Sequence, residues 1–226
     1  MLRVLVVLCL ASALLIAACG EDDDGGGGAA ATPAPTEEAG PAGCEAAEAP
    51  QPKGEGKLPK PKETLDPAKT YVATVSTNCG DFEITLDAKR APKTGGSFKS
   101  LADKGFYAGT TFHRIVAGFV IQGGDPKGDG TGGPGYSVVE APPKDLLYEK
   151  GVVAMAKTGT EPAGTSGSQF FVVTAEDAQL PPDYALLGKV TAGQEVVDKI
   201  GVVEIDPATE QPVEPVVIRS VEVSER

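Results

Sequence analysis

One long segment of this chain has almost no large apolar residues, and it limits where a hydrophobic core can form. Over residues 20–70 there is no aromatic residue, no Val and no Ile, and Leu58 and Leu65 are the only large aliphatic residues. Such a segment buries too little apolar surface to offset the entropy lost on ordering. The sequence therefore predicts a flexible tether over residues 19–70, rich in Gly, Pro and acidic residues, and a folded domain over residues 71–226.

The first residues have the form of a secretory signal. Arg3 precedes an apolar run over residues 4–18, which is shorter than the roughly 20 residues of a membrane-spanning helix. The run ends in two alanines followed by Cys19, and this ending resembles a bacterial lipoprotein signal. The resemblance implies that residues 1–18 are removed and that Cys19 is diacylated, which would anchor the protein to the bacterial cell membrane outside the cytoplasm. An uncleaved anchor or a buried Cys is the alternative.

Two further cysteines, Cys44 and Cys79, remain once Cys9 has left with the signal. An even number of leftover thiols outside the cytoplasm indicates a disulfide. Because Cys44 lies in the expected tether and Cys79 in a predicted turn, a bridge would staple the end of the tether to the domain. Two free or buried thiols are the alternative.

Short β-rich runs separated by Gly and Pro loops make up the rest of the chain. Strands are predicted over residues 71–77, 82–87, 111–116, 119–122, 152–156, 169–174, 186–190 and 216–223. Helices are predicted over residues 92–104, where Pro92 suits the first turn, and over residues 194–200. This pattern favours a mainly β barrel or sandwich, and a closed barrel would leave no exposed edge.

Two dense blocks carry the functional signal. The first reads FHRIVAGFVIQGGD over residues 112–125, with GTGG over residues 130–133, and the second reads SGSQFFVVT over residues 166–174. Together they resemble the cyclophilin family of peptidyl-prolyl cis–trans isomerases, over about residues 71–223. The resemblance implies a closed eight-stranded antiparallel barrel capped by two helices, in agreement with the strands and helices read from periodicity.

The chemistry of such an isomerase requires no cofactor and no metal. Rotation about an X–Pro bond is slow because twisting breaks amide resonance, with a barrier of about 18–20 kcal/mol. The enzyme needs an apolar socket for the proline ring and a fixed donor for the prolyl nitrogen, which regains its lone pair in the twisted amide. A guanidinium suits this task because it is always charged, rigid and multidentate.

The resemblance implies roles for individual residues. Arg114 is the expected catalytic residue, with Gln122 orienting it or the substrate carbonyl, and His113 bonding near the substrate backbone. The expected walls of the proline pocket are Phe119, Val120, Phe171 and Leu180. The residues expected around the pocket and in the neighbouring groove are Gln169, Ala156, Lys157, Thr158, Tyr184, Gly130 and Thr131, with Leu187 behind the pocket. Outside this motif, an Arg or His in a strand would more often have a structural role, and Phe119 and Phe171 would be residues of the hydrophobic core.

Several other function classes are disfavoured. A formal net charge of −12 gives no basic face for nucleic acid. The single His cannot belong to a multi-histidine metal site, and the glycines of residues 123–133 lack the Gly-Lys-Ser/Thr ending of a phosphate loop. We expect a monomer that accelerates X–Pro rotation in unfolded or surface-exposed extracytoplasmic proteins during folding. A non-catalytic chaperone or proline-segment binding module on the same barrel is the alternative.

One position departs from the family pattern. Many cyclophilins carry Trp or Phe immediately before the residue that matches Leu180, whereas this chain has Gln179. In the family that aromatic ring helps to hold cyclosporin. We therefore expect weak cyclosporin binding with isomerase activity largely retained.

Overall fold

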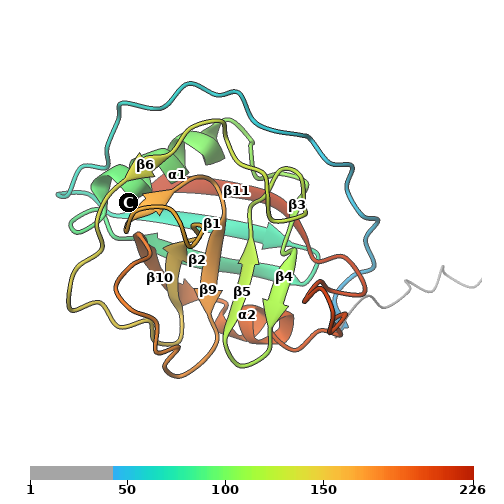
Figure 1. Ribbon diagram of the computed structural model, residues 1–226. Helices are drawn as coiled ribbons and strands as arrows, with labels where there is room; N and C mark the ends of the chain where they lie inside the picture. The colour runs from blue at the N-terminus through green and yellow to red at the C-terminus, as the bar shows by residue number, and fades with distance from the viewer. Residues whose placement is uncertain (1–42) are drawn as a thin grey trace, which may run out of the picture. The chain divides into compact units, whose positions relative to one another are not determined.

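Nine strands of the computed structural model, which describes residues 43–226, form one curled antiparallel sheet (Figure 1). Their order is β3-β11-β1-β2-β10-β7-β9-β5-β4. The bounds are Tyr71–Thr77 (β1), Gly80–Leu86 (β2), Thr110–Thr111 (β3), Arg114–Val116 (β4), Val120–Gly123 (β5), Val152–Met155 (β7), Phe170–Val173 (β9), Leu186–Ala192 (β10) and Val217–Glu225 (β11). A separate pair joins β6 (Val138–Val139) to β8 (Thr165–Ser166), and the sequence did not predict it.

The two ends of the sheet are consecutive pieces of chain. β3 pairs with β11 and β4 pairs with β5, yet only Phe112 and His113 separate β3 from β4. The strand predicted over residues 111–116 is therefore one bent segment that brings both ends of the sheet together. Counted in this way, the sheet has the eight predicted strands. The description as a closed eight-stranded barrel is approximate, because hydrogen bonding is interrupted at the bend.

Strand alternation separates a buried face from an outer face. Ile115, Ile121 and Val172 are direct cross-strand partners on β4, β5 and β9, and all three are fully buried. Since successive side chains point to opposite faces of a strand, their neighbours in sequence face outward. The outer face of these three strands is where the motif residues gather.

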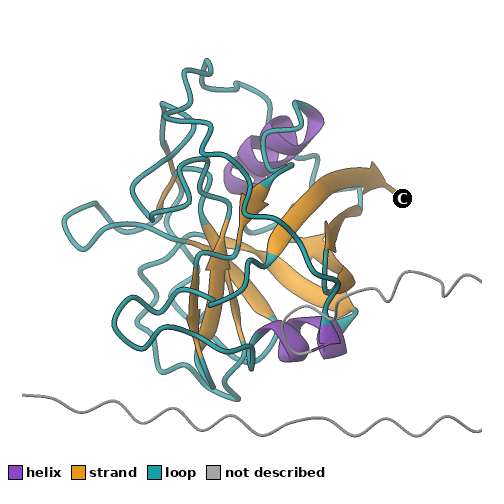
Figure 2. Ribbon diagram, turned by 90° about the vertical axis from the view of Figure 1, so that its right-hand side faces the viewer, coloured by secondary structure: helices purple, strands orange, loops and turns teal. Residues whose placement is uncertain are grey.

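Two helices lie at opposite ends of the sheet (Figure 2). α1 (Pro92–Asp103) begins with the predicted Pro, and its first free amides, those of Lys93 and Thr94, donate to the Glu140 carboxylate at 3.1 and 2.7 Å. Its Phe98 ring packs edge-on against Phe170, with centroids 5.7 Å apart. α2 (Gln194–Ile200) buries Val196, Val197 and Ile200 at the other end.

Residues 43–70, which we call the N-terminal strap, lie on the domain (Figure 1). A disulfide joins Cys44 to Cys79. Further along, the backbone amides of Lys53, Gly56 and Leu58 donate to the carbonyls of Pro126, Gly133 and Pro134 at 2.8, 2.8 and 3.0 Å. Near the end of the strap, Leu65 is buried against α1, and its amide donates to the Pro92 carbonyl.

These contacts correct the expectation of a flexible tether for residues 43–70. The prediction rested on the scarcity of large apolar side chains, and that scarcity is real. The strap is held instead by a disulfide and by backbone hydrogen bonds, which leave little trace in composition. Gly56 permits the close approach, since a Cβ there would lie 2.7 Å from the Pro134 Cα.

The predicted signal peptide and Cys19 lie outside the described residues. Within residues 43–226, no helix is long and apolar enough to cross a membrane.

Candidate active site

A row of cross-strand partners places the motif side chains together on the outer face. Arg114 on β4 is opposite Gln122 on β5, and Gln122 is opposite Phe171 on β9. Val120 lies two residues before Gln122 and therefore shares its face. Gly118, with φ of 68°, turns the chain between β4 and β5 and leaves Phe119 half-buried immediately before β5.

This row borders a cavity of about 200 Å3. Its lining comprises Arg114, Phe119, Val120, Gln122, Ala156, Lys157, Phe171, Leu180 and Tyr184. The four residues expected to form the walls of the proline pocket are all among them. The cavity thus combines apolar walls with polar side chains, among them the Arg114 guanidinium, and its size suits a single small ring.

The polar side chains at the cavity are connected in a way the sequence did not predict. Gln122 Nε2 donates to Gln169 Oε1 at 3.0 Å, and Gln169 Nε2 donates to the carbonyls of Gly130 and Gly132, both at 2.9 Å. In the described part of the chain, no hydrogen bond joins the side chains of Gln122 and Arg114. The partner of Arg114 is Glu210, whose Oε2 accepts from Arg114 Nε at 2.6 Å.

A larger groove of about 840 Å3 adjoins the cavity and shares Gln122, Ala156 and Lys157 with it. The predicted groove residues Gln169, Thr158, Gly130 and Thr131 all line it. The loop that forms one wall is held from below by Asp125, a buried carboxylate that accepts the amides of Lys127, Gly130 and Gly132 at 2.8, 2.6 and 3.2 Å. Glu55 of the N-terminal strap also reaches this groove.

Two residues that line the cavity, Lys157 and Tyr184, are held by an ion pair and by contacts with aromatic rings. Lys157 Nζ pairs with Asp183 Oδ2 at 2.7 Å and lies 5.5 Å from the centre of the Tyr184 ring. The Tyr184 ring in turn meets Phe171 edge-on at 5.4 Å. Tyr148 lies behind them and donates its hydroxyl to the Tyr184 carbonyl at 2.7 Å; burial raises the pKa of Tyr148 to about 12, which keeps this donor protonated.

His113 and Leu187 lie away from the cavity. Leu187 is fully buried in the barrel interior, so it does not reach substrate, and its neighbour Leu186 packs with Phe171 instead. His113 is buried at the bend between β3 and β4, and neither ring nitrogen has a hydrogen-bond partner within residues 43–226. Burial lowers the pKa of His113, opposed by the nearby Asp125, so the ring is neutral at pH 7.

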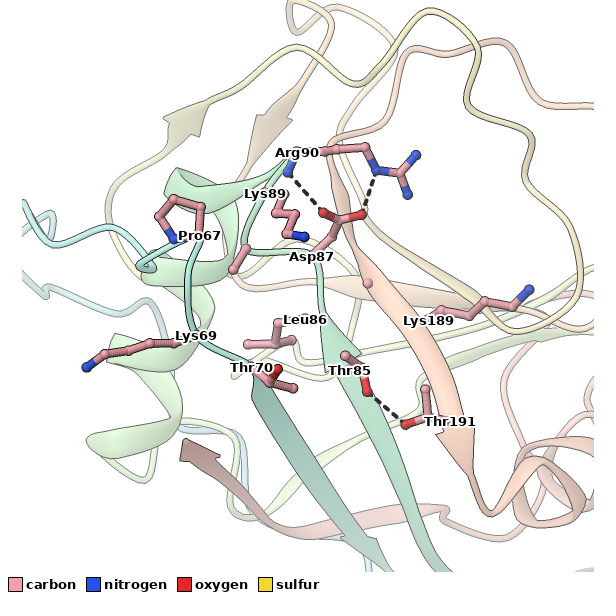
Figure 3. Close-up of a pocket in the computed structure, with 12 residues that line it drawn as sticks. Pro67, Lys69, Thr70, Thr85, Leu86, Asp87, Lys89, Arg90, Lys189 and Thr191 are labelled. Carbon is pink, nitrogen blue, oxygen red and sulfur yellow. Dashed lines mark hydrogen bonds and ion pairs between the residues drawn. The ribbon is translucent and has the colours of Figure 1, made fainter. Parts of the chain in front are cut away.

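Another cavity, of about 350 Å3, lies beside β2 and β10 (Figure 3). It is bordered by Lys69, Lys89, Arg90 and Lys189, but Arg90 is bonded to Asp87, and Lys69 and Lys189 extend in opposite directions. These cations do not converge on a common point. In the part of the chain with described coordinates, no cluster of three or more His, Cys, Asp or Glu could hold a metal ion.

Comparison with known proteins agrees with this geometry. The family model described as "Cyclophilin type peptidyl-prolyl cis-trans isomerase/CLD" matches residues 72–223. The chain belongs to the cyclophilin family. Peptidyl-prolyl cis-trans isomerase B of Streptomyces anulatus is 41% identical over 178 residues, which cover 70% of this chain and 99% of that protein. A Helicobacter pylori peptidyl-prolyl cis-trans isomerase is 42% identical over 136 residues, which cover 59% of this chain and 82% of that protein.

Solved cyclophilin structures share the fold. A Cryptosporidium parvum cyclophilin-type isomerase superposes with a TM-score of 0.65 at 30% identity, covering 70% of this chain and 99% of its own. A structure of the same protein in the presence of the dipeptide Ala-Pro gives a TM-score of 0.64 at 31% identity, over 69% of this chain and 99% of that one. This cyclophilin is thus a peptidyl-prolyl cis–trans isomerase.

Proposed function

We propose that this isomerase binds proline in the cavity of about 200 Å3 and uses Arg114 to stabilise the twisted X–Pro amide. The observation that carries the proposal is the row of Arg114, Gln122 and Phe171 across three adjacent strands at the margin of that cavity. Because all three side chains stand on sheet positions, their spacing is set by the backbone rather than by flexible loops.

The proposed mechanism needs only binding and one charged donor. Phe119, Val120, Phe171 and Leu180 hold the pyrrolidine ring and keep water from it. As the amide twists, the prolyl nitrogen regains its lone pair and accepts a hydrogen bond from the guanidinium of Arg114. This interaction is absent in the planar ground state, so it lowers the barrier rather than merely increasing affinity.

The residues that flank the proline would lie in the neighbouring groove. Gln122 and Gln169 form a bonded pair between the cavity and the Gly130–Gly132 loop. We propose that Gln122 organises the groove and the substrate, whereas Arg114 acts on the amide. His113 lines neither the cavity nor the groove, so it would affect substrate binding indirectly, through the wall of the groove.

We further propose that the enzyme works outside the cytoplasm, where it assists the folding of secreted or surface proteins. Support comes from the apolar run that ends at Cys19 and from a disulfide between Cys44 and Cys79, a bond typical of oxidising compartments. Lipid on Cys19 would hold the domain at the membrane, and residues 20–42 would provide the spacing.

The location is tested by expressing the full chain and a Cys19→Ser variant, then separating membranes from soluble fractions. We expect the wild type in the membrane fraction, with a diacylated N-terminal peptide by mass spectrometry, and the variant released or unprocessed. Wild-type protein recovered without lipid from the soluble cytoplasm would contradict the proposed location, but it would leave the isomerase site unaffected.

Substrate binding is tested by titrating a short Ala-Pro peptide into labelled protein and following amide and methyl resonances by NMR. We expect the largest shifts around Val120, Phe171 and Leu180. A Phe171→Ala variant should weaken binding at least tenfold, whereas Leu147→Ala, an exposed apolar residue on the surface, serves as the matched control. Shifts confined to the basic cavity of Figure 3 would refute the assignment of the proline pocket.

A further inference from the structure

The segment that connects α2 to β11 covers the outer edge of β4, the strand that carries Arg114. β4 is the last strand of the sheet, so its outer edge lacks a strand partner. The Ile115 amide on that edge donates instead to the Glu210 carbonyl at 2.8 Å. The Glu210 amide donates to the Asp206 carbonyl, also at 2.8 Å, and its φ of 59° places Glu210 at a sharp turn. The backbone of Glu210 is therefore fixed beside Arg114.

From this position the Glu210 side chain reaches one particular nitrogen of Arg114. Its Oε2 accepts from Nε at 2.6 Å, and this is the only hydrogen bond that the Arg114 side chain makes within residues 43–226. A guanidinium has five N–H donors in a rigid plane. Because Glu210 takes the donor nearest the side-chain stem, the four donors on the two terminal nitrogens stay free.

We propose that Glu210 is a positioning residue that holds the guanidinium of Arg114 in its catalytic orientation, an inference that rests on the proposed role of Arg114. A bond at Nε fixes the rotation of the guanidinium plane while leaving its outer end free for the prolyl nitrogen. The orientation of Arg114, one of the two tasks that the resemblance implied for Gln122, thus passes to a residue 96 positions away in the chain.

The Glu210 carboxylate also partly neutralises the positive charge of Arg114 that stabilises the twisted amide. Its orienting effect, which favours catalysis, therefore competes with this reduction of charge, which opposes it. Both side chains are partly exposed, at 37% for Arg114 and 42% for Glu210, and solvent screens the Coulomb interaction at such exposure. The directional effect of the hydrogen bond does not depend on this screening. Orientation therefore outweighs charge reduction, and removal of Glu210 slows catalysis.

The test measures the exchange rate of the enzyme-bound Ala-Pro peptide and its dissociation constant separately, by NMR lineshape analysis. Glu210→Ala is expected to lower the on-enzyme rate about five- to tenfold and to change the dissociation constant less than twofold. Glu210→Gln should stay within about twofold of wild type, because its amide oxygen still accepts from Nε–H. Glu204→Ala is the matched control, since this exposed carboxylate in the same segment bonds to nothing in the described part of the chain.

A structural readout separates positioning from loss of fold. The Nε–H signal of Arg114 should exchange slowly with water in wild type and in Glu210→Gln, and rapidly in Glu210→Ala, at unchanged melting temperature. In the double variant Arg114→Ala/Glu210→Ala, the rate should equal that of Arg114→Ala alone, because Glu210 acts only through Arg114.

The outcomes are distinguishable. If Arg114→Ala abolishes exchange while Glu210→Ala retains the full rate, the positioning role is refuted and the proposed function stands. If Arg114→Ala itself remains active, the proposed function fails. A Glu210→Gln variant as slow as Glu210→Ala would also overturn the inference, because it would show that the charge of Glu210, and not its acceptor, is what matters.

Discussion

Removal of the Cys44–Cys79 disulfide should destabilise the domain and release the N-terminal strap together. The bond closes a loop with a sequence separation of 35 residues, and both cysteines are buried, at 3% and 4% exposure. In the chain-entropy model, a loop of this length contributes up to about 4 kcal/mol through the unfolded state. A domain of this size loses about 2–4 °C in melting temperature per kcal/mol, so we expect a decrease of about 10 °C.

The assay compares melting temperatures by circular dichroism, using the chain from residue 20 onward. The oxidised wild type is measured with and without reductant, beside a Cys44→Ser/Cys79→Ser variant. The reduced wild type and the variant should both melt about 10 °C lower, and the variant should not respond to reductant. Measuring the variant with and without reductant controls for any effect of the reductant that does not involve this disulfide.

Amide hydrogen exchange reports on the strap itself. The amides of Lys53, Gly56 and Leu58 bond to the loop of residues 126–134, so they should be protected while the disulfide is intact. Protection should be lost in the double variant while the β9 amides remain protected. A variant that melts within about 2 °C of the oxidised wild type, with the strap amides still protected, would refute this reasoning.

Three further predictions follow from the core, the buried His and the departure at residue 179. Phe170→Ala should lower the free energy of unfolding by about 3–5 kcal/mol, because Phe170 is fully buried among the aromatic rings beneath the sheet. Leu147→Ala, at a residue that is 64% exposed, should lower it by less than about 0.5 kcal/mol. Denaturant unfolding measures both values. Burial lowers the pKa of His113 in the folded protein below its ordinary value of 6.5. The unfolded chain therefore takes up the proton first as the pH falls, so the free energy of unfolding should be highest above pH 6.5 and should decrease toward the lowered pKa. Unfolding of wild type and His113→Gln, compared from pH 7.5 to 4.5, isolates this contribution. Cyclosporin should inhibit isomerisation only weakly, because Gln179 stands where many cyclophilins have an aromatic ring; inhibition is measured on the purified enzyme.

Each of these predictions has a contrary result. Equal losses for Phe170→Ala and Leu147→Ala would contradict the described core. Identical pH profiles for wild type and His113→Gln would show that His113 does not carry the acid sensitivity. Inhibition by cyclosporin at the potency typical of the family would show that Gln179 does not limit its binding.

The fold could be predicted closely because its signals are local. Alternation of apolar residues places β1 and β2, and helix signals such as Pro92 place the helices, within a residue or two of their observed bounds; the dense motif places β4, β5 and β9. The two-residue strands β6 and β8 were missed because such short segments carry no periodicity. The strap was misjudged because its contacts are made by backbone groups and one disulfide.

The candidate site could be predicted only as far as its motif extends. Arg114, Gln122 and Phe171 belong to two motif blocks, and the register of β4, β5 and β9 brings them together as the resemblance implies. Glu210 carries no such signal: it lies in an irregular segment, and its contact with Arg114 depends on a tertiary approach. Leu187 lies in the interior of the barrel, whereas its neighbour Leu186 is on the face that packs with Phe171, because successive residues of a strand point to opposite faces.

The most direct test of the central claim is NMR exchange spectroscopy on an Ala-Pro peptide with the wild type and an Arg114→Ala variant, each at a concentration below that of the peptide. The account predicts rapid cis–trans exchange with the wild type, and a rate at least a hundredfold lower with the variant although the peptide still binds. Equal exchange rates for the two proteins would contradict the assignment of Arg114. Binding without exchange in either protein would instead leave a proline-segment binding module on a cyclophilin barrel.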